Sequence, residues 1–515
     1  MYLTQGLHRA VQHTPDAPAT IFGERMRTYR EQADRVARLA GAVRELGVGV
    51  GERVGILARN SDRYAELLLA VPWAGGVLNP LNVRWSPREL VYALRESQTN
   101  ILLVDDAAAE RVPALADGRP DLKVLIHLDE GPPADGMLGY EELIAGTRPV
   151  EDARRGGDAL AGIFYTGGTT GSPKGVMLSH ANLLTSTLGT LATVPIAHPG
   201  GRTLVAAPMF HASGLTAWAL QLAVGGSCVI LPGFEPLAVL EAIARHRITS
   251  AVLVPTMVQM LLHHPAFGTH DLSSLRSLLY AASPMSPSLL DRVLRALPQT
   301  ALTQAYGMTE LAPITTLLSP AGHREGKLRC SVGRAAAHAE VRVVDDHDQE
   351  VPSGTVGEIV ARGAHVMLRY WNKPEETAKA LRGGWMHTGD AGSMDDHGYV
   401  HLVDRLKDMI ITGASNVYSV EVENAVASHP AVAACAVIGV PDATWGERVH
   451  AVIVPRPGHR VAAGEIRAHC KTLIADYKAP RSVELVDALP LSPQGKVLKH
   501  ELRKPHWEGM DRQVH

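Results

Sequence analysis

The stretch YTGGTTGSPKG at residues 165–175 indicates the fold and the chemistry more directly than any other part of the sequence. Its four glycines let backbone N–H groups approach an anion closely, and three threonines and Lys174 add hydroxyl donors and one positive charge. The stretch follows an apolar run at 161–165 and precedes Val176-Met177-Leu178, so we expect a loop between two strands or between a strand and a turn. It is not a Walker loop, because no Gly-Lys-Ser/Thr opens a helix. These features predict a phosphate-binding loop, with a flexible Gly/Thr hairpin as the alternative.

The rest of the sequence has the composition of an ordinary globular protein with more than one domain. The chain has 515 residues, roughly three to four typical domain lengths. With 46% hydrophobic and 20% charged residues, it is neither a disordered chain nor a small disulfide scaffold. Lys+Arg 50 against Asp+Glu 53 gives a net charge of −3, so no basic field exists for binding nucleic acid or an anionic membrane.

The cysteines and the N-terminus predict a protein of the reducing cytoplasm. The cysteines lie far apart without a CxxC pair, which argues against a zinc ribbon or a redox pair. The N-terminus lacks the apolar core of a secretory signal. The longest apolar stretch, 214–232, is interrupted by Gln221 and by Gly225-Gly226, so we expect a buried helix and strand there rather than a membrane span.

The first 400 or so residues alternate between helix and strand patterns. Thr28 and Ser86 each begin a Ser/Thr-x-x-Glu helix start. Short apolar runs at 53–58, 100–104 and 227–231 predict buried strands, and strands separated by helices imply parallel sheets covered on both faces. Segments rich in Pro, Gly and Asp predict surface connections at 115–121, 131–136 and 147–158.

The pattern changes near residue 338, and again near 404. Alternating β patterns at 341–344 and 357–360 predict a region of strands. After a charged string at 404–408 we expect a compact unit with helices at 420–428 and 463–474 and strands at 433–439 and 449–454. We therefore expect an N-terminal domain over 1–404 and a C-terminal domain over 405–515, the latter long enough for its own core.

Four further motifs follow the 165–175 loop in order: QAYGMTE at 304–310, WMHTGD at 385–390, DRLKD at 404–408 and PLSPQGKV at 490–497. Together they resemble the motifs of the adenylate-forming superfamily, which includes acyl-CoA synthetases, peptide-synthetase adenylation domains and luciferases. The resemblance covers essentially the whole chain. It implies an α/β fold: a large N-terminal domain of parallel sheets sandwiched by helices, with a β-subdomain, followed by a small mobile α+β C-terminal domain.

The resemblance also implies an activity. A carboxylic acid and ATP would form an acyl-AMP and pyrophosphate, and CoA would then displace AMP to give the acyl-CoA, with Mg²⁺ bound to the phosphates. The acid would be a medium- or long-chain fatty acid or an aromatic, phenylpropenoic acid. An acyl-AMP ligase that loads a free-standing carrier protein is the alternative, and a catalytically silent nucleotide-binding protein is a more distant one. We expect a monomer or homodimer with no nucleic-acid partner.

Each implied site residue suits its role chemically. Lys496 would contact both the acid and the α-phosphate and reduce the repulsion between these two anions. Glu310 and Thr166 would hold the metal, since Mg²⁺ takes oxygen ligands, and His211 would close the acid site or line the path of the thiol. The residues implied to bind nucleotide are Thr166, Gly167, Gly168, Thr169, Thr170, Gly171, Lys174, Ala281, Ala282, Gln304, Ala305, Tyr306, Gly307, Thr309, Asp390, Arg405 and Lys407.

Two chemical steps at one site call for a conformational change. The family rotates its small domain about a hinge, which aligns here with Lys407. Rotation would bring residues 413–418 to the site in place of the Lys496 loop. Ala414 and Ser415 depart from the family's usual pattern in that segment and would reshape the thiol tunnel. Trp218, Met257 and Met308 would line a tunnel for the acid chain or fill the core.

Overall fold

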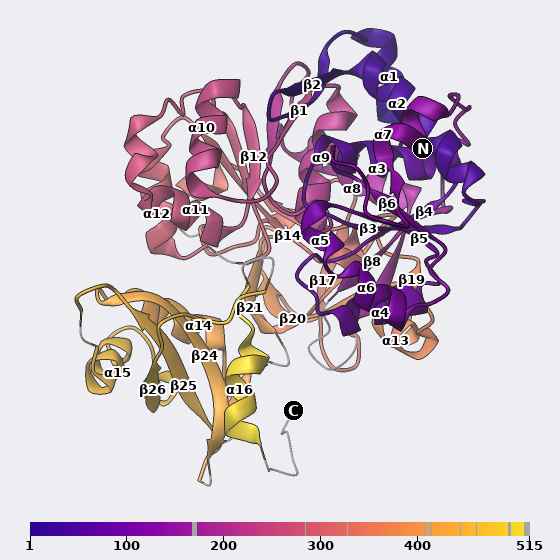
Figure 1. Ribbon diagram of the computed structural model, residues 1–515. Helices are drawn as coiled ribbons and strands as arrows, with labels where there is room; N and C mark the ends of the chain where they lie inside the picture. Colours follow the sequence, from indigo (N-terminus) through magenta and orange to yellow (C-terminus); the bar gives the residue numbers. More distant parts are fainter. Residues whose placement is uncertain are drawn as a thin grey trace.

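The computed structural model describes the chain except for residues 167–172, 284, 327, 406–407, 413–414, 443, 460, 493–495 and 509–515, and of residues 405, 415 and 416 it describes the backbone only. The described strands form four sheets (Figure 1). The helix α1 (Gln5–His13) precedes the first of them.

One large sheet contains the hairpin that carries the 165–175 loop. In spatial order its strands are β19 (Arg369–Tyr370), β9 (Lys174–Ser179), β8 (Leu160–Thr166), β4 (Val77–Pro80), β3 (Arg53–Leu57), β5 (Ile101–Val104), β6 (Val124–His127) and β7 (Leu138–Gly139). The strands from β8 to β7 pair in parallel, and β9 and β19 close one edge antiparallel. The helices that precede, separate or follow these strands in sequence are α2 (Tyr29–Glu45), α3 (Asp62–Ala74), α4 (Pro87–Glu96), α5 (Asp106–Ala109), α6 (Val112–Gly118), α7 (Tyr140–Gly146) and α8 (His180–Thr193).

The second large sheet is also parallel in its centre. In spatial order its strands are β16 (Arg334–Ala335), β15 (Thr316–Leu318), β14 (Ala301–Tyr306), β13 (Ser277–Tyr280), β12 (Ser250–Leu253), β10 (Arg202–Val205), β11 (Ser227–Ile230), β1 (Pro18–Phe22) and β2 (Arg25–Thr28). Its helices are α9 (Ala212–Val224), α10 (Pro236–His246), α11 (Pro255–His263) and α12 (Pro287–Ala296). The predicted buried helix and strand within 214–232 are therefore α9 and β11, and Trp218 is 2% exposed in the core.

A smaller antiparallel sheet follows, as the alternating pattern after residue 338 predicts. Its strands are β17 (Glu340–Val344), β18 (Gly357–Arg362), β20 (Met386–Met394) and β21 (Val400–Arg405), with α13 (Pro374–Ala380) before β20. Because β21 runs antiparallel to β20, the end of β21 returns to Asp390.

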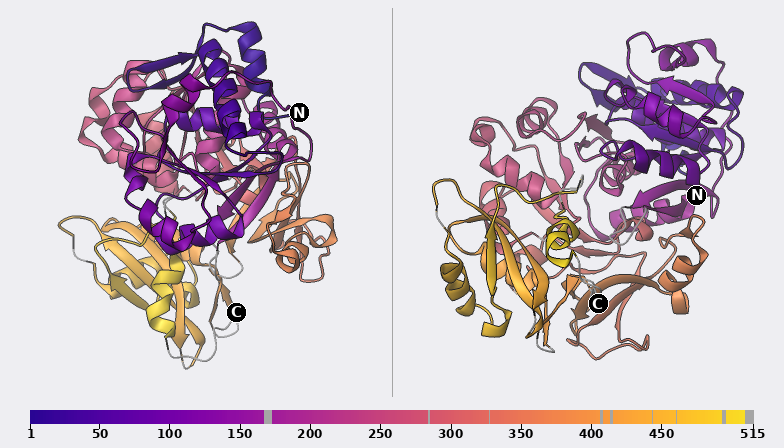
Figure 2. Two further views of the ribbon diagram at one scale, coloured as in Figure 1. Left: turned by 45° about the vertical axis from the view of Figure 1, so that its right-hand side comes forward. Right: turned by 60° about the horizontal axis from the view of Figure 1, so that its bottom comes forward.

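The chain after residue 410 forms what we call the C-terminal unit. Its strands are β22 (Ile410–Thr412), β23 (Ser415–Val417), β24 (Val432–Asp442), β25 (Gly446–Pro455) and β26 (Ser482–Leu485), and its helices are α14 (Ser419–Ala427), α15 (Ala463–Lys471) and α16 (Lys499–Trp507). It has a buried core of its own, with Val422, Val437 and Ile453 among its members. Figure 2 shows these elements gathered at one end of the molecule in both further views.

The predicted fold class is confirmed, and most predicted elements agree with the structure to within a few residues. The side chains of Thr28 and Ser86 cap α2 and α4 in capping boxes. The connection predicted at 115–121 is wrong in its first half, because α6 continues to Gly118. Pro113 lies in the first turn of α6, where proline is tolerated because its missing N–H has no partner within the helix. Among the helices in the described part of the chain, none is both long and apolar enough to cross a membrane.

Candidate active site

The predicted phosphate loop is the connection of a β-hairpin. Thr166, the last residue of β8, pairs with Lys174, the first residue of β9. The Thr166 hydroxyl lies 3.5 Å from the Lys174 carbonyl oxygen, at the outer limit of a hydrogen bond. The loop thus lies between two strands, as expected. The predicted phosphate contacts at Gly167, Gly168, Thr169, Thr170 and Gly171 lie outside the described residues.

Tyr370 connects the hairpin to the predicted magnesium ligand. The Lys174 ammonium lies 5.2 Å from the centre of the Tyr370 ring, and the Tyr370 hydroxyl donates a 2.8 Å hydrogen bond to Oε1 of Glu310. Burial, and then the charge of Glu310, raise the pKa of Tyr370, so its hydroxyl keeps the proton it donates. Glu310 is 5% exposed. Lys174 and Glu310 are therefore brought to one place. No motif in the sequence marks Tyr370, which arrives there because β19 pairs with β9.

The predicted adenine and ribose residues meet as well. The Tyr306 hydroxyl donates a 2.8 Å hydrogen bond to Asp390 Oδ2, and the Tyr306 ring packs against the core of the smaller sheet. Asp390 and Arg405 are directly opposite each other on β20 and β21. The backbones of the two residues are therefore adjacent at this point of the sheet. The Arg405 side chain and Lys407 lie outside the described part of the chain.

The residues around Tyr306 contribute mainly through packing and backbone position. Gln304 accepts a 3.1 Å hydrogen bond from the Tyr280 hydroxyl, and Ala305 is buried in the main core. A Cβ at Gly307 would lie 2.1 Å from the Pro313 carbonyl oxygen, so only glycine fits at this position. Thr309 begins the short 3₁₀ turn, η2 (Thr309–Leu311), that contains Glu310.

Ala281 and Ala282 follow β13 at the carboxyl end of a parallel strand, where ligands bind in open α/β sheets. Ala282 has φ of +76°, an uncommon conformation for a residue with a side chain. Such backbone strain is concentrated at functional sites.

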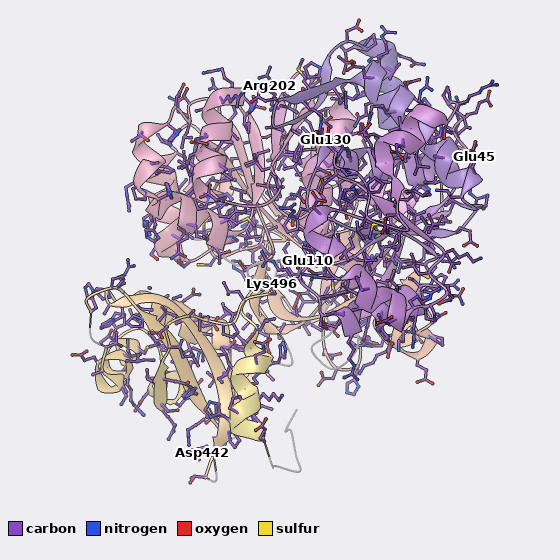
Figure 3. All side chains as sticks on the ribbon, in the orientation of Figure 1. Glu45, Glu110, Glu130, Arg202, Asp442 and Lys496 are labelled. Carbon is purple, nitrogen blue, oxygen red and sulfur yellow. The ribbon has the colours of Figure 1, made fainter. Side chains whose placement is uncertain are left out.

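Lys496 lies where the C-terminal unit meets the rest of the molecule (Figure 3). Its backbone is fixed by a small β-bridge: the Ser492 N–H donates to the Lys496 carbonyl at 2.7 Å, and the Lys496 N–H donates to Ser492 Oγ at 3.1 Å. Burial, and then the positive charge of Lys496, lower the pKa of His211 to about 3. The amine is thus close enough to influence His211, although the two residues are far apart in sequence.

His211 is also the N-cap of α9. Its Nδ1 accepts a 3.3 Å hydrogen bond from the Ser213 N–H. Since Nδ1 is the acceptor, the neutral ring carries its proton on Nε2, which is the nitrogen left for a ligand.

After Lys496, ion pairs join α16 to residues that follow the predicted hinge, and Ser419 extends these contacts to Asp404 before it. The Lys499 ammonium lies 2.7 Å from Glu423 on α14 and donates to Ser419 Oγ. The Ser419 N–H donates in turn to Asp404 at the end of β21. Arg503 on α16 pairs with Asp408 at 2.8 Å. The segment that carries Lys496 is therefore anchored just after Lys496.

We expect the free energy of unfolding to decrease in acid because the protein contains buried, neutral histidines. Burial, and then the nearby His338, lower the pKa of His365 to about 3. The unfolded chain takes up a proton near pH 6.5 whereas the folded chain does not. The stability that His365 and His211 provide is therefore complete above about pH 6.5 and decreases as the pH falls towards 3. Lowering the pH from 7 to 5 should reduce the free energy of unfolding by roughly 2 kcal/mol for each of these two histidines.

Urea denaturation of the full chain at pH 7 and pH 5 measures this effect. His365→Gln should reduce the difference between the two pH values, while His500→Gln, an exposed residue on α16, should leave it unchanged. An equal pH dependence in both variants and the wild type would contradict the assignment.

Comparison with known proteins agrees with this geometry. Residues 7–371 match the family model described as AMP-binding enzyme, and residues 421–496 match the AMP-binding enzyme C-terminal domain. A feruloyl-CoA synthase from Amycolatopsis sp is 43% identical over 96% of this chain and 97% of its own length. A fatty acid–[acyl-carrier-protein] ligase, ScoC, from Streptomyces coeruleorubidus is 34% identical over 98% of this chain and 96% of its own.

Among solved structures, the anthranilate CoA ligase AuaEII in complex with anthranoyl-AMP superimposes with a TM-score of 0.92 and 28% identity, covering 98% of this chain and 97% of that one. The fold is that of an adenylate-forming enzyme. The chain belongs to the AMP-binding enzyme family. It is an AMP-forming acid–CoA ligase, which joins a carboxylic acid to CoA at the expense of ATP through an acyl-adenylate.

Proposed function

We propose that the acid is an aromatic phenylpropenoic acid of the ferulate type. The observation that carries this proposal is the 43% identity to the feruloyl-CoA synthase over nearly the full length of both chains. The anthranilate ligase, whose fold is so similar, also acts on an aromatic acid. The half-buried side chains of Ala281 and Met308, which pack against the main core near the predicted nucleotide residues, are our candidates for the wall of the acid pocket.

In this proposal the site residues are divided between the acid and the parts of ATP. Lys496 contacts the acid carboxylate and the α-phosphate of ATP, and His211 faces the acid with its Nε2–H. Tyr306 and the segments around Ala281 and Gly307 hold the adenine, and Asp390 and Arg405 hold the ribose. The hairpin from Thr166 to Lys174 holds the phosphates.

We propose that Glu310 and Thr166 would hold Mg²⁺ beside the phosphates. Glu310 is a buried carboxylate that accepts a hydrogen bond from Tyr370, whose ring lies beside the ammonium of Lys174, and carboxylate oxygens are ligands that this ion takes. When bound, the ion would neutralise charge that develops on the phosphates.

The boundary between the domains belongs to the same proposal. We place it at 404/405 with the hinge at Lys407, and the separate core of the C-terminal unit supports this division. Rotation there would replace the Lys496 loop by residues 413–418 for the CoA step. A cytoplasmic location and a monomeric or homodimeric state remain part of the proposal.

A second candidate is the loading of a fatty acid onto a free-standing carrier protein. The observation in its favour is the full-length similarity to ScoC, at 34% identity. The lower identity makes it the weaker of the two.

A screen of acids separates the candidates. AMP release would be measured with ATP, Mg²⁺ and CoA for ferulate, 4-coumarate, benzoates and fatty acids of increasing length. We expect kcat/KM for the phenylpropenoic acids to exceed that for the best fatty acid by at least about tenfold, equivalent to 1.4 kcal/mol of transition-state binding. A matched series replaces CoA with a phosphopantetheinylated carrier protein. A preference for long-chain acids, or for the carrier over CoA, would overturn the first proposal.

A further inference from the structure

Two histidines and one glutamate meet in the C-terminal unit, away from the residues proposed for catalysis. His450 lies on β25, Glu484 on β26 and His506 on α16. One ligand atom from each lies within 4.8 Å of those of the other two. These three elements lie in separate parts of the sequence and meet only in the folded chain. No motif in the sequence marks the group.

The spacing of the three ligand atoms is close to that of a metal site, and His450 Nε2 and Glu484 Oε2 already form a long hydrogen bond. Glu484 Oε2 lies 3.4 Å from His450 Nε2 and 3.8 Å from His506 Nε2. Both distances exceed the 2.7–3.2 Å range usual for N–H···O hydrogen bonds. In a tetrahedral site with metal–ligand bonds of about 2.1 Å, adjacent ligand atoms lie about 3.4 Å apart. Small side-chain movements would bring these three atoms onto one face of such a tetrahedron.

The hydrogen bond of Ser482 orients the buried histidine for this role. Ser482 Oγ lies 2.7 Å from His450 Nδ1, and Ser482 is the residue opposite His450 in the parallel pairing of β25 and β26. Metal-bound histidines nearly always use their second nitrogen in this way, which fixes the ring and its tautomer. The side chain of His450 is 6% exposed, that of His506 is 30% exposed and that of Glu484 is 50% exposed. The group is therefore buried on the side of His450 and open to solvent on the side of His506 and Glu484, where an ion and water can enter.

In a second group of potential ligands, Asp106, His127 and Asp129, the histidine ring has a different partner arrangement. His127 Nε2 lies only 2.6 Å from Asp106 Oδ1, and the Asp106 N–H donates to Asp129. The ring nitrogen there is already used in a direct hydrogen bond.

We propose that His450, Glu484 and His506 form a binding site for Zn²⁺, with water as the fourth ligand. Two imidazoles and a carboxylate are a ligand set that zinc accepts in tetrahedral geometry. The ion would fasten α16 to β25 and β26. Because α16 begins three residues after Lys496, the ion would hold in place the element to which the Lys496 loop is attached.

The test uses the full chain, freed of metal with a chelator, and titration with Zn²⁺ alone. We expect one site whose affinity falls at least about tenfold in His506→Gln and in Glu484→Gln, and about tenfold in Ser482→Ala through loss of the supporting hydrogen bond. His500→Gln, on the same helix but exposed and outside the group, should bind as the wild type does. Co²⁺ in place of Zn²⁺ should give the visible absorption typical of four-coordinate cobalt in the wild type and not in His506→Gln.

Thermal unfolding provides a second measurement. Zn²⁺ at one hundred times its Kd should raise the Tm of the wild type by a few degrees, since a ligand that binds only the folded state stabilises it. The rise should be absent in His506→Gln, whose Tm without metal shows whether the variant itself folds. Equal Zn²⁺ affinity in His506→Gln, His500→Gln and the wild type would overturn the proposal, as would an equal rise in Tm.

Discussion

Lys496→Ala should lower the rate of acid-dependent pyrophosphate release about 10²–10³-fold, the usual cost of removing a group that stabilises transition-state charge. The first step brings a carboxylate up to the α-phosphate, so two anions must meet. In its proposed role the ammonium of Lys496 reduces this repulsion, and its positive charge also contributes to the lowered pKa of His211, the residue proposed to face the acid. Conversion of supplied acyl-AMP and CoA to the thioester should stay close to the wild-type rate, because the proposed rotation removes the Lys496 loop before that step.

Lys504→Ala is the matched control, since Lys504 is an exposed lysine on the helix that follows the loop. It should leave both half-reactions unchanged. If Lys496→Ala slowed both half-reactions equally, the alternation of the two loops would be wrong for this enzyme. The variant Lys496→Arg keeps the positive charge but replaces the compact ammonium with a planar guanidinium. Near-normal adenylation in that variant would show that a compact ammonium is not required.

Lys499→Met should have the largest effect on stability, about 3 kcal/mol of unfolding free energy in the C-terminal unit, at the lower end of the range for a broken buried ion pair. The lower end applies because the Lys499 and Glu423 side chains are still 15% and 21% exposed. Removal of the lysine leaves Glu423 in the interior without its cation. It also frees α16 from Ser419 and so loosens the attachment of the Lys496 loop.

Calorimetry and limited proteolysis of the full chain measure this loss, and Lys504→Met controls for the removal of a lysine from α16. The double variant Glu423→Gln/Lys499→Met should recover most of the stability, because neither partner is then left charged and buried. Unfolding of Lys499→Met at the same temperature as Lys504→Met would show that the pair contributes little.

Local sequence patterns were sufficient for the main features of the fold. The capped helix starts at Thr28 and Ser86 and the strand that precedes the 165–175 loop depend on neighbouring residues, so a single stretch of sequence predicts them. The missed part of α6 shows the limit of this approach, because Pro113 and the residues that follow have the composition of a turn. Their helical conformation depends on packing, with Val112 and Leu115 buried.

The supporting contacts of the site could not be predicted in this way. Tyr370 reaches Glu310 because a two-residue strand, β19, adds to the edge of a sheet whose other strands lie far away in sequence. The Lys499–Glu423 pair likewise depends on how α16 packs beside α14. Motifs specify the residues that meet a ligand, whereas the residues that hold them come from non-local packing.

The position of His211 limits how the substrate range of this enzyme can change. The side chain proposed to face the acid is also the cap of α9, so mutation for a new acid acts on the helix as well. Loss of an N-cap typically costs about 0.5–2 kcal/mol, and only Ser, Thr, Asp and Asn replace it well. Libraries aimed at new acids should therefore retain small polar residues at position 211 and draw their diversity from other proposed pocket positions such as Met308, whose hydrogen bond with Leu311 uses the backbone carbonyl.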